Sequence, residues 1–283
     1  MNEAHKLQPR DQVRQYYDDN SSFWERFGHG GIAIHRAVWA DGVTSRKEAF
    51  GYLDGLVAQQ AASLCREAPR LLDLGCGLGA SLLRLTALLP GATGVGVTIS
   101  PKQAARAREL VADAALGGRV RCIEGDYLEL PDDLGTFDLA FAIESFVHTP
   151  NAGAFFASVA RRLRPGGRLI VCDDFCARAA RSQREGRWLD LMRRGWMANT
   201  LITVEAASEH AVPHGLHQIE SRDLTDHLEL RRPRDLMLSA LLLFARPFRP
   251  RSMLWRSWMG GDALQRALVA RLVEYRFTVF ERR

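Results

Sequence analysis

A glycine-rich run directly after a short apolar segment is the part of this sequence best suited to bind a ligand. Residues 71–74 (LLDL) lead into residues 75–79 (GCGLG) and an amphipathic stretch, and Asp73 stands two positions before the first glycine. Glycine accepts positive φ and lets a ligand approach the backbone, while the first turn of a following helix offers unpaired N–H groups. The spacing Asp-x-Gly-x-Gly-x-Gly differs from the Gly-x-Gly-x-x-Gly loop of nucleotide-dependent dehydrogenases. We therefore predict a strand–loop–helix ligand site of another class.

A second candidate for chemistry is the carboxylate of Glu144, which directly follows the apolar run 137–143 and stands four positions before His148. The carboxyl end of a buried parallel strand faces the crevice where ligands bind in such sheets. Burial at that place suits a carboxylate to accept a proton. The alternative for Glu144 is a structural or helix-capping acid, and a lone histidine such as His148 often only satisfies a loop.

The elements that position these residues follow from the hydrophobic pattern between residues 70 and 176. Short apolar runs predict strands over residues 71–74, 94–98, 120–124, 137–143 and 168–172. Amphipathic stretches predict helices over residues 81–89, 102–114 and 152–163. Pro101 suits a helix start, and residues 164–167 (RPGG) suit a helix stop and a tight turn into the fifth strand. This alternation indicates parallel strands joined by right-handed crossovers.

The pattern is less regular on both sides of this core. Residues 9–27 and 45–65 are predicted to be helices, as are most of residues 177–213 and a buried stretch over 232–245. Residues 215–224 and 274–281 are predicted to be strands, the second because its apolar residues alternate. The domain organisation predicted from these patterns is a helical cap over 1–66, a core over 67–176, and lid insertions with the last two strands over 177–283.

Three motifs in the correct order resemble those of class I S-adenosylmethionine-dependent methyltransferases. Residues 73–79 (DLGCGLG) resemble the loop that packs against the methionine part of the cofactor. Residues 125–131 (GDYLELP) resemble the adenine-binding motif, and residues 163–169 (LRPGGRL) resemble the turn before the fifth strand. The resemblance implies an α/β, Rossmann-like, doubly wound fold: a mostly parallel seven-stranded sheet with an antiparallel last strand, covered by a helical lid.

The resemblance also implies S-adenosyl-L-methionine as cofactor and a set of residues that contact it. In the adenine motif, Asp126 is placed for the exocyclic amine and Tyr127 flanks the ring. The sequence departs from the common pattern after the second strand, where Thr98 occupies the place of a ribose-binding carboxylate, so Thr98 and Gln103 are the candidates for the ribose hydroxyls. An ordinary strand residue is the alternative for Thr98. The full predicted cofactor set is Asp73, Gly75, Cys76, Gly77, Gly79, Thr98, Ile99, Gln103, Asp126, Tyr127 and Ile143.

Within this family, the nearest resemblance is to the sterol, tocopherol and prenyl diphosphate C-methyltransferases and the cyclopropane fatty acid synthases. Residues 141–151 (FAIESFVHTPN) resemble the sterol methyltransferase string that carries an acid and a histidine, and residues 16–35 resemble that group's entry segment. The predicted catalytic residues are Glu144, His148 and Tyr17. The predicted substrate-pocket residues are Trp24, His29, His35 and Trp196, and generic core packing is the alternative for Trp24.

The predicted function is therefore methyl transfer from S-adenosylmethionine to a small, hydrophobic molecule. The resemblance favours a carbon acceptor in a prenyl or terpenoid compound, a sterol-like olefin or an electron-rich aromatic metabolite. Two alternatives stay open: O- or N-methylation of a natural product, and a cofactor-binding, cyclase-like protein that no longer transfers a methyl group.

Composition and charge disfavour several other classes. The five cysteines form no C-x-x-C pair that would indicate a metal site. A cluster of possible ligands, Glu209, His210, His214 and His217, is interrupted by Pro213 and Gly215. We therefore predict no metal site. The net charge of +5 comes from arginines along the chain, which does not indicate nucleic-acid binding. No signal peptide and no spanning apolar stretch is visible, which predicts a cytoplasmic protein. Residues 246–261, rich in Arg and Trp, suit weak contact with a membrane surface, contact with an acidic substrate head group, or a solvated loop over a cap. A homo-oligomer is compatible with the sequence.

Overall fold

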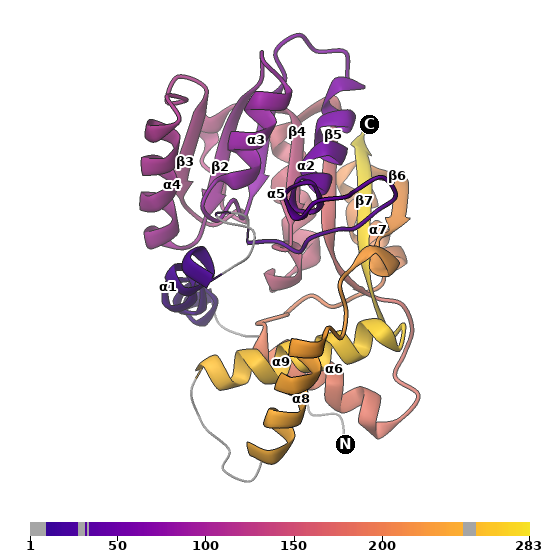
Figure 1. The fold of residues 1–283 in the computed structure, drawn as a ribbon. Coiled ribbons are helices and arrows are strands. Elements are labelled where there is room, and N and C mark those ends of the chain that lie inside the picture. Colours follow the sequence, from indigo (N-terminus) through magenta and orange to yellow (C-terminus); the bar gives the residue numbers. More distant parts are fainter. Residues whose placement is uncertain (1–9, 28–31, 33, 246–252) are drawn as a thin grey trace.

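The computed structural model describes residues 10–27, 32, 34–245 and 253–283; the side chains of 19–27, 243–245, 253 and 254 are not described. In these ranges one seven-stranded sheet has the order β3-β2-β1-β4-β5-β7-β6 (Figure 1). Its strands are β1 (Arg70–Leu74), β2 (Thr93–Thr98), β3 (Val120–Glu124), β4 (Phe137–Ile143), β5 (Leu163–Cys176), β6 (Leu216–Asp223) and β7 (Val273–Arg282). All neighbours pair in parallel except β7, which is antiparallel to β5 and β6. This confirms the predicted Rossmann-like sheet with an antiparallel last strand.

Helices cover both faces of the sheet because its central strands are apolar on both sides. In β4, Leu139 and Phe141 pack on one face, and Ala140 and Ala142 pack on the other. The first face is covered by α2 (Arg46–Ala62), α3 (Ala80–Leu88) and α4 (Pro101–Asp113). The second face is covered by α5 (Ala152–Arg162) and α7 (Val204–Ala211). The period of two within each strand therefore divides the core into two layers.

Local capping explains where several of these helices begin. Ser45 and Glu48 form a capping box at the start of α2. Ser100 caps α4, its hydroxyl accepting a hydrogen bond from the Gln103 N–H, and Pro101 is the first helical residue, as predicted. These caps place the amino end of α4 beside the carboxyl end of β2, where the ribose contact was predicted.

A group of helices lies beyond the carboxyl ends of β1, β2 and β4 (Figure 1). It comprises α1 (Arg10–Phe27), α6 (Gln183–Gly195), α8 (Pro233–Ala245) and α9 (Met253–Val269). Helices α6 and α9 cross closely, since a Cβ added to Gly260 would lie 2.9 Å from the Gly195 Cα atom. These helices are the lid expected from the family resemblance. No helix in the described ranges is long and apolar enough to cross a membrane.

Three sequence predictions differ from the structure. Strand β5 begins at Leu163, opposite Phe137, and its register shifts to pair Leu139 with Arg168, so the RPGG segment is an irregularity inside a strand. Residues 177–213 form two separate helices, because the Thr203 hydroxyl accepts from the Ala206 N–H and starts α7. The loop alternative for residues 246–261 is wrong from Met253 onward, where α9 begins and buries Leu264 and Leu268 in the core.

Candidate active site

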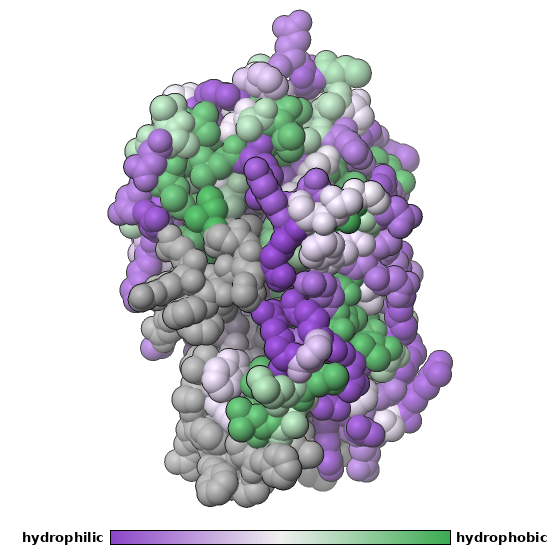
Figure 2. Space-filling view, in the orientation of Figure 1, coloured by the Kyte–Doolittle hydropathy of each residue, from purple (hydrophilic) through white to green (hydrophobic). Residues whose placement is uncertain are grey.

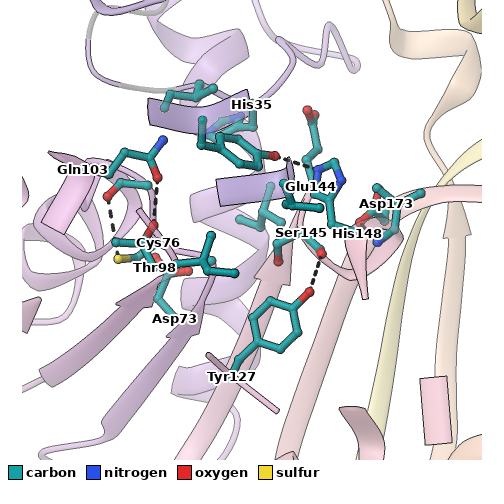
Figure 3. Close-up of a pocket in the computed structure, with 18 of the residues that line it drawn as sticks. His35, Asp73, Cys76, Thr98, Gln103, Tyr127, Glu144, Ser145, His148 and Asp173 are labelled. Carbon is teal, nitrogen blue, oxygen red and sulfur yellow. Dashed lines mark hydrogen bonds between the residues drawn. The ribbon is translucent and has the colours of Figure 1, made fainter. Parts of the chain in front are cut away.

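A cavity of about 620 Å³ lies between the carboxyl edge of the sheet and the lid helices. The glycine loop after β1 forms one wall, and residues from α1, the segment before α2, the segment after α6 and α9 form the other. Figure 3 shows Asp73, Thr98 and Glu144 among the residues that line the cavity. The predicted residues that line it are Tyr17, His35, Asp73, Gly75, Cys76, Gly77, Thr98, Ile99, Gln103, Asp126, Tyr127, Ile143, Glu144, His148 and Trp196. Of the other predicted residues, the side chain of Trp24 and all of His29 lie outside the described part of the chain.

The glycines of the loop have distinct structural roles. Gly75 has a φ of +95°, and a Cβ there would lie 2.4 Å from the Ser145 Cβ atom. Gly77 has a φ of +53° and lines the cavity, and the only side chain near an added Cβ in the described structure is Ile34, at 3.4 Å. Gly79 does not line the cavity. With a φ of +80°, it caps α3 and packs near the Cys122 Sγ atom, and its contact with the cofactor stays a prediction.

Thr98 and Gln103 are hydrogen-bonded to each other at the end of β2. The buried Thr98 hydroxyl donates to Gln103 Oε1 at 2.8 Å, which fixes the orientation of the amide. Ser100, between them, donates to Asp18 of α1, and Lys102 Nζ donates to the Asp18 carbonyl at 3.2 Å. The structure thus joins a polar cavity wall to the helix that covers it.

The wall predicted for the adenine ring contains Tyr127 and Asp126. The Tyr127 hydroxyl donates to the Ser145 carbonyl at 3.0 Å, and its ring meets the Phe155 ring edge-on with centroids 5.5 Å apart. Burial raises the pKa of the Tyr127 hydroxyl. Asp126 Oδ1 accepts from the Leu128 N–H at 2.9 Å, which holds the carboxylate at the rim of the cavity. These contacts set the position of both side chains before any ligand binds.

Asp73 is an acid with almost no exposure to solvent. Burial raises the pKa of its carboxyl well above the ordinary value, and nearby Cys122 and Asp54 act in the same direction. A buried carboxyl that faces a cavity is stabilised in its ionised form by a cationic ligand group. This wall is therefore suited to an ammonium group.

Glu144 is anchored through one of its two carboxylate oxygens. Its Oε1 atom accepts from the Arg36 N–H at 2.8 Å and from the Tyr275 hydroxyl at 2.9 Å, and lies 3.7 Å from Arg36 Nε. Among the described residues, Oε2 has no hydrogen-bond partner. The backbone of Glu144 has a φ of +52°, which is uncommon for a non-glycine residue. The strand end and these contacts hold one oxygen in place and leave the other for the cavity.

His148 and Tyr17 both line the cavity and form a hydrogen-bonded pair. His148 Nδ1 lies 3.1 Å from the Met197 carbonyl, so this nitrogen carries the proton and donates. The Tyr17 hydroxyl then donates to Nε2 at 2.6 Å. Burial lowers the pKa of His148, which agrees with a neutral imidazole. The pair fastens α1 to the segment after β4, so the structure brings the two predicted residues Tyr17 and His148 together.

Sequence reasoning missed Arg36 and the two acids at the end of β5. Arg36 donates from both terminal nitrogens to Asp174, at 2.7 and 2.6 Å, and its guanidinium lies 4.6 Å from the Tyr275 ring centroid. Asp173 Oδ2 accepts from the Val147 N–H at 2.9 Å, and burial raises its pKa well above the ordinary value. The pair of acids in residues 173–174 at the end of an apolar run was a usable signal. Arg36 has no local pattern that could have revealed it.

Two predicted pocket residues, His35 and Trp196, lie close to Arg36. His35 Nδ1 lies 3.1 Å from the Arg36 carbonyl, and its buried Nε2 has no hydrogen-bond partner in the described structure. Trp196 donates from Nε1 to the Ser257 carbonyl at 3.2 Å, and its ring centroid is 5.7 Å from the Arg36 guanidinium. No group of three His, Cys, Asp or Glu side chains in the described ranges could hold a metal ion.

Comparisons with known proteins agree with this architecture. Residues 71–167 match the methyltransferase domain family. The chloroplastic tocopherol O-methyltransferase of Arabidopsis thaliana is 28% identical over 169 residues, which cover 56% of this chain and 48% of that protein. Cycloartenol-C-24-methyltransferase 1 of Oryza sativa subsp. japonica is 30% identical over 164 residues, covering 58% and 46%. The chain spans about half the length of the curated relatives it matches.

A solved structure extends the likeness over the whole fold. The cyclopropane synthase MmaA2 from Mycobacterium tuberculosis superposes with a TM-score of 0.78 at 17% identity, covering 98% of this chain and 100% of that one. The sheet order, the glycine loop and the family match are consistent with one another. Residues 71–167 therefore match a methyltransferase domain, and the chain has the Rossmann-like methyltransferase fold of that solved structure.

Proposed function

We propose that this chain transfers a methyl group from S-adenosylmethionine to a carbon atom of a small hydrophobic acceptor: a prenyl or terpenoid compound, a sterol-like olefin or an electron-rich aromatic metabolite. The observation that carries the proposal is one cavity that extends from the glycine loop to the anchored carboxylate of Glu144. The core over 67–176 would hold the cofactor. The cap over 1–66 and the segment 177–283 would select the acceptor.

Four features of the cavity support a bound cofactor. The open backbone at Gly77 suits a ligand lying along the loop. The buried Asp73 suits the ammonium group of its methionine part, and the Thr98–Gln103 pair offers hydrogen bonds to the ribose. Asp126 and Tyr127 form the wall for the adenine. The bound cofactor supplies an activated methyl group on a sulfonium, so the protein has mainly to align the acceptor and exclude water, effects that contribute up to about 7–11 kcal/mol.

Glu144 is the proposed proton acceptor. When an alkene carbon takes the methyl group, the C–S electron pair stays on sulfur and the neighbouring carbon becomes a cation. The rings of Tyr17 and Trp196 line the cavity and can each stabilise that cation by about 0.5–2 kcal/mol. Loss of a proton from an adjacent carbon to Glu144 Oε2 then restores a double bond. Arg36 and Tyr275 act as positioning residues, since both contact the other oxygen.

The Tyr17–His148 pair favours a second candidate function, O- or N-methylation. Nε2 of the neutral His148 imidazole accepts a hydrogen bond from the Tyr17 hydroxyl. If a hydroxyl or an amine received the methyl group, the same nitrogen could take up its proton instead. Tyr17 would then have to leave Nε2. A carbon acceptor needs no such displacement, because Glu144 Oε2 has no partner to lose in the described structure.

The test is a transfer assay with radiolabelled S-adenosylmethionine and separate panels of prenyl or sterol olefins, phenols and amines. Label in a carbon-methylated product supports the proposal. Label found only on oxygen or nitrogen overturns the carbon acceptor and supports the second candidate. Cofactor binding without transfer on any panel overturns both in favour of a non-methylating protein.

A smaller prediction concerns the ribose wall. Thr98→Val keeps the side-chain shape but removes the hydroxyl that orients Gln103, so affinity for S-adenosylhomocysteine should fall by about 1 kcal/mol, or about fivefold. Isothermal titration calorimetry measures the change. Thr278→Val is a matched control, because Thr278 is buried in β7 away from the cavity and should leave the affinity unchanged. An unchanged dissociation constant for Thr98→Val would place the ribose contact elsewhere.

A further inference from the structure

Helix α8 buries Leu242 on its inner side and, unlike an ordinary surface helix, is also apolar on its outward face. Its outward face carries Leu236, Met237 and Leu241, which are 43%, 71% and 57% exposed. Its polar residues turn inward instead: Asp235 accepts from Arg232, and Ser239 donates to Asp262 of α9. Figure 2 shows apolar residues gathered where α8 lies in Figure 1. An apolar face on the outside of a helix indicates a binding surface.

The segment of the sequence that contains this helix carries an excess of positive charge. Residues 231–258 contain seven arginines and one acid, Asp235, a net charge of +6. The whole chain has a net charge of +5, so the remainder has a net charge of −1. Arginines occur throughout the chain, but elsewhere acids balance them. Arg231 and Arg256 are exposed, and the Arg234 side chain is 50% exposed.

We propose that the outward face of α8, formed by Pro233, Leu236, Met237, Ala240 and Leu241, binds the surface of an anionic lipid bilayer. A helix with an apolar face and flanking basic residues lies in the plane of the bilayer interface, where the apolar side chains enter the acyl boundary and the cations meet anionic headgroups. A second copy of the chain fits less well, because two faces of the same charge would repel each other. A nucleic acid would leave the apolar side chains without a partner.

The position of α8 gives this contact a consequence for the cavity. Helix α8 packs against α9, and Ser257 of α9 lines the cavity and contacts both Tyr16 and Trp196. A bilayer bound at α8 would therefore lie on the lid side of the cavity. This consequence rests on the proposed hydrophobic acceptor, whereas the bilayer contact itself does not.

The experiment is flotation of the full chain with vesicles of phosphatidylcholine containing phosphatidylglycerol, compared with vesicles of phosphatidylcholine alone. The wild type should float with the anionic vesicles, and added salt should weaken this binding. The triple variant Leu236→Gln, Met237→Gln, Leu241→Gln should bind the anionic vesicles at least about tenfold more weakly. The control variant Val212→Gln, Ile219→Gln removes exposed apolar residues far from α8 in the chain and should bind as the wild type does.

Separate readouts keep this test independent of the proposed reaction. S-adenosylhomocysteine affinity and thermal unfolding of the triple variant show that the core is intact, because all three substituted side chains are exposed. Vesicle binding equal to that of the wild type overturns the proposal. So does light scattering that shows a vesicle-free dimer lost in the triple variant, or DNA that binds the wild type and competes with the vesicles. Failure of methyl transfer with intact vesicle binding would overturn only the proposed function.

Discussion

Gly77→Val should abolish measurable binding of S-adenosylhomocysteine while the protein stays folded. Gly77 has a φ of +53°, which a β-branched residue adopts only with strain of about 1–3 kcal/mol. The valine side chain would also enter the cavity beside the loop, an overpacking that costs about 1–3 kcal/mol. The strain lowers the stability of the folded protein, whereas the overpacking opposes the bound cofactor and lowers its affinity by up to about 100-fold. Calorimetric titration of wild type and variant measures it.

Gly166→Val is the matched control for backbone strain. Gly166 also has a positive φ, of +74°, but it is exposed at the start of β5, and an added Cβ would have no neighbour within 4 Å. This variant should lose some thermal stability and keep the cofactor affinity of the wild type. Equal affinity in Gly77→Val and wild type would contradict the placement of the cofactor along the loop. An equal loss in both variants would assign the effect to strain alone.

Glu144→Gln should lower turnover by about 10²–10⁴-fold while cofactor affinity stays unchanged. Glutamine has the size of glutamate and keeps one oxygen, which can still accept from the Arg36 N–H and the Tyr275 hydroxyl. It lacks the second carboxylate oxygen that would receive the proton. With a prenyl or sterol olefin as acceptor, a cation that is not deprotonated by residue 144 should also lose a proton elsewhere, which gives other olefins, or react with water to give an alcohol. Mass spectrometry identifies these products.

Tyr275→Phe separates a catalytic role of Glu144 from a structural one. It removes one donor to Oε1 and leaves the carboxylate and its Arg36 contacts in place. The expected loss of turnover is small, with the product pattern of the wild type. If Tyr275→Phe and Glu144→Gln lose activity equally, turnover depends on the hydrogen-bond network around Arg36, and Glu144 is a positioning residue. Wild-type turnover in Glu144→Gln would end the proposed role outright.

The cofactor half of the cavity could be predicted from the sequence because its parts are local. Residues 71–79 contain the strand, the glycines and the start of the helix in one continuous segment, and the requirement for positive φ is visible as glycine at 75 and 77. Thr98 and Gln103 lie five residues apart across a capped helix start, and they bond to each other as well as lining the cavity. Short-range backbone geometry decides such features, so residue type and spacing are sufficient to reveal them.

The acceptor half depended on the tertiary structure. Tyr17 meets His148 across 131 positions of the chain, Arg36 meets Asp174 across 138, and Tyr275 meets Glu144 across 131. No periodicity records such pairs, because they arise from the packing of α1, the segment before α2 and β7 against the end of β4. The exposed apolar face of α8 could not be predicted for the same reason. An apolar helix in a sequence is predicted to be buried, and only the packing decides which face α9 covers and which face stays exposed.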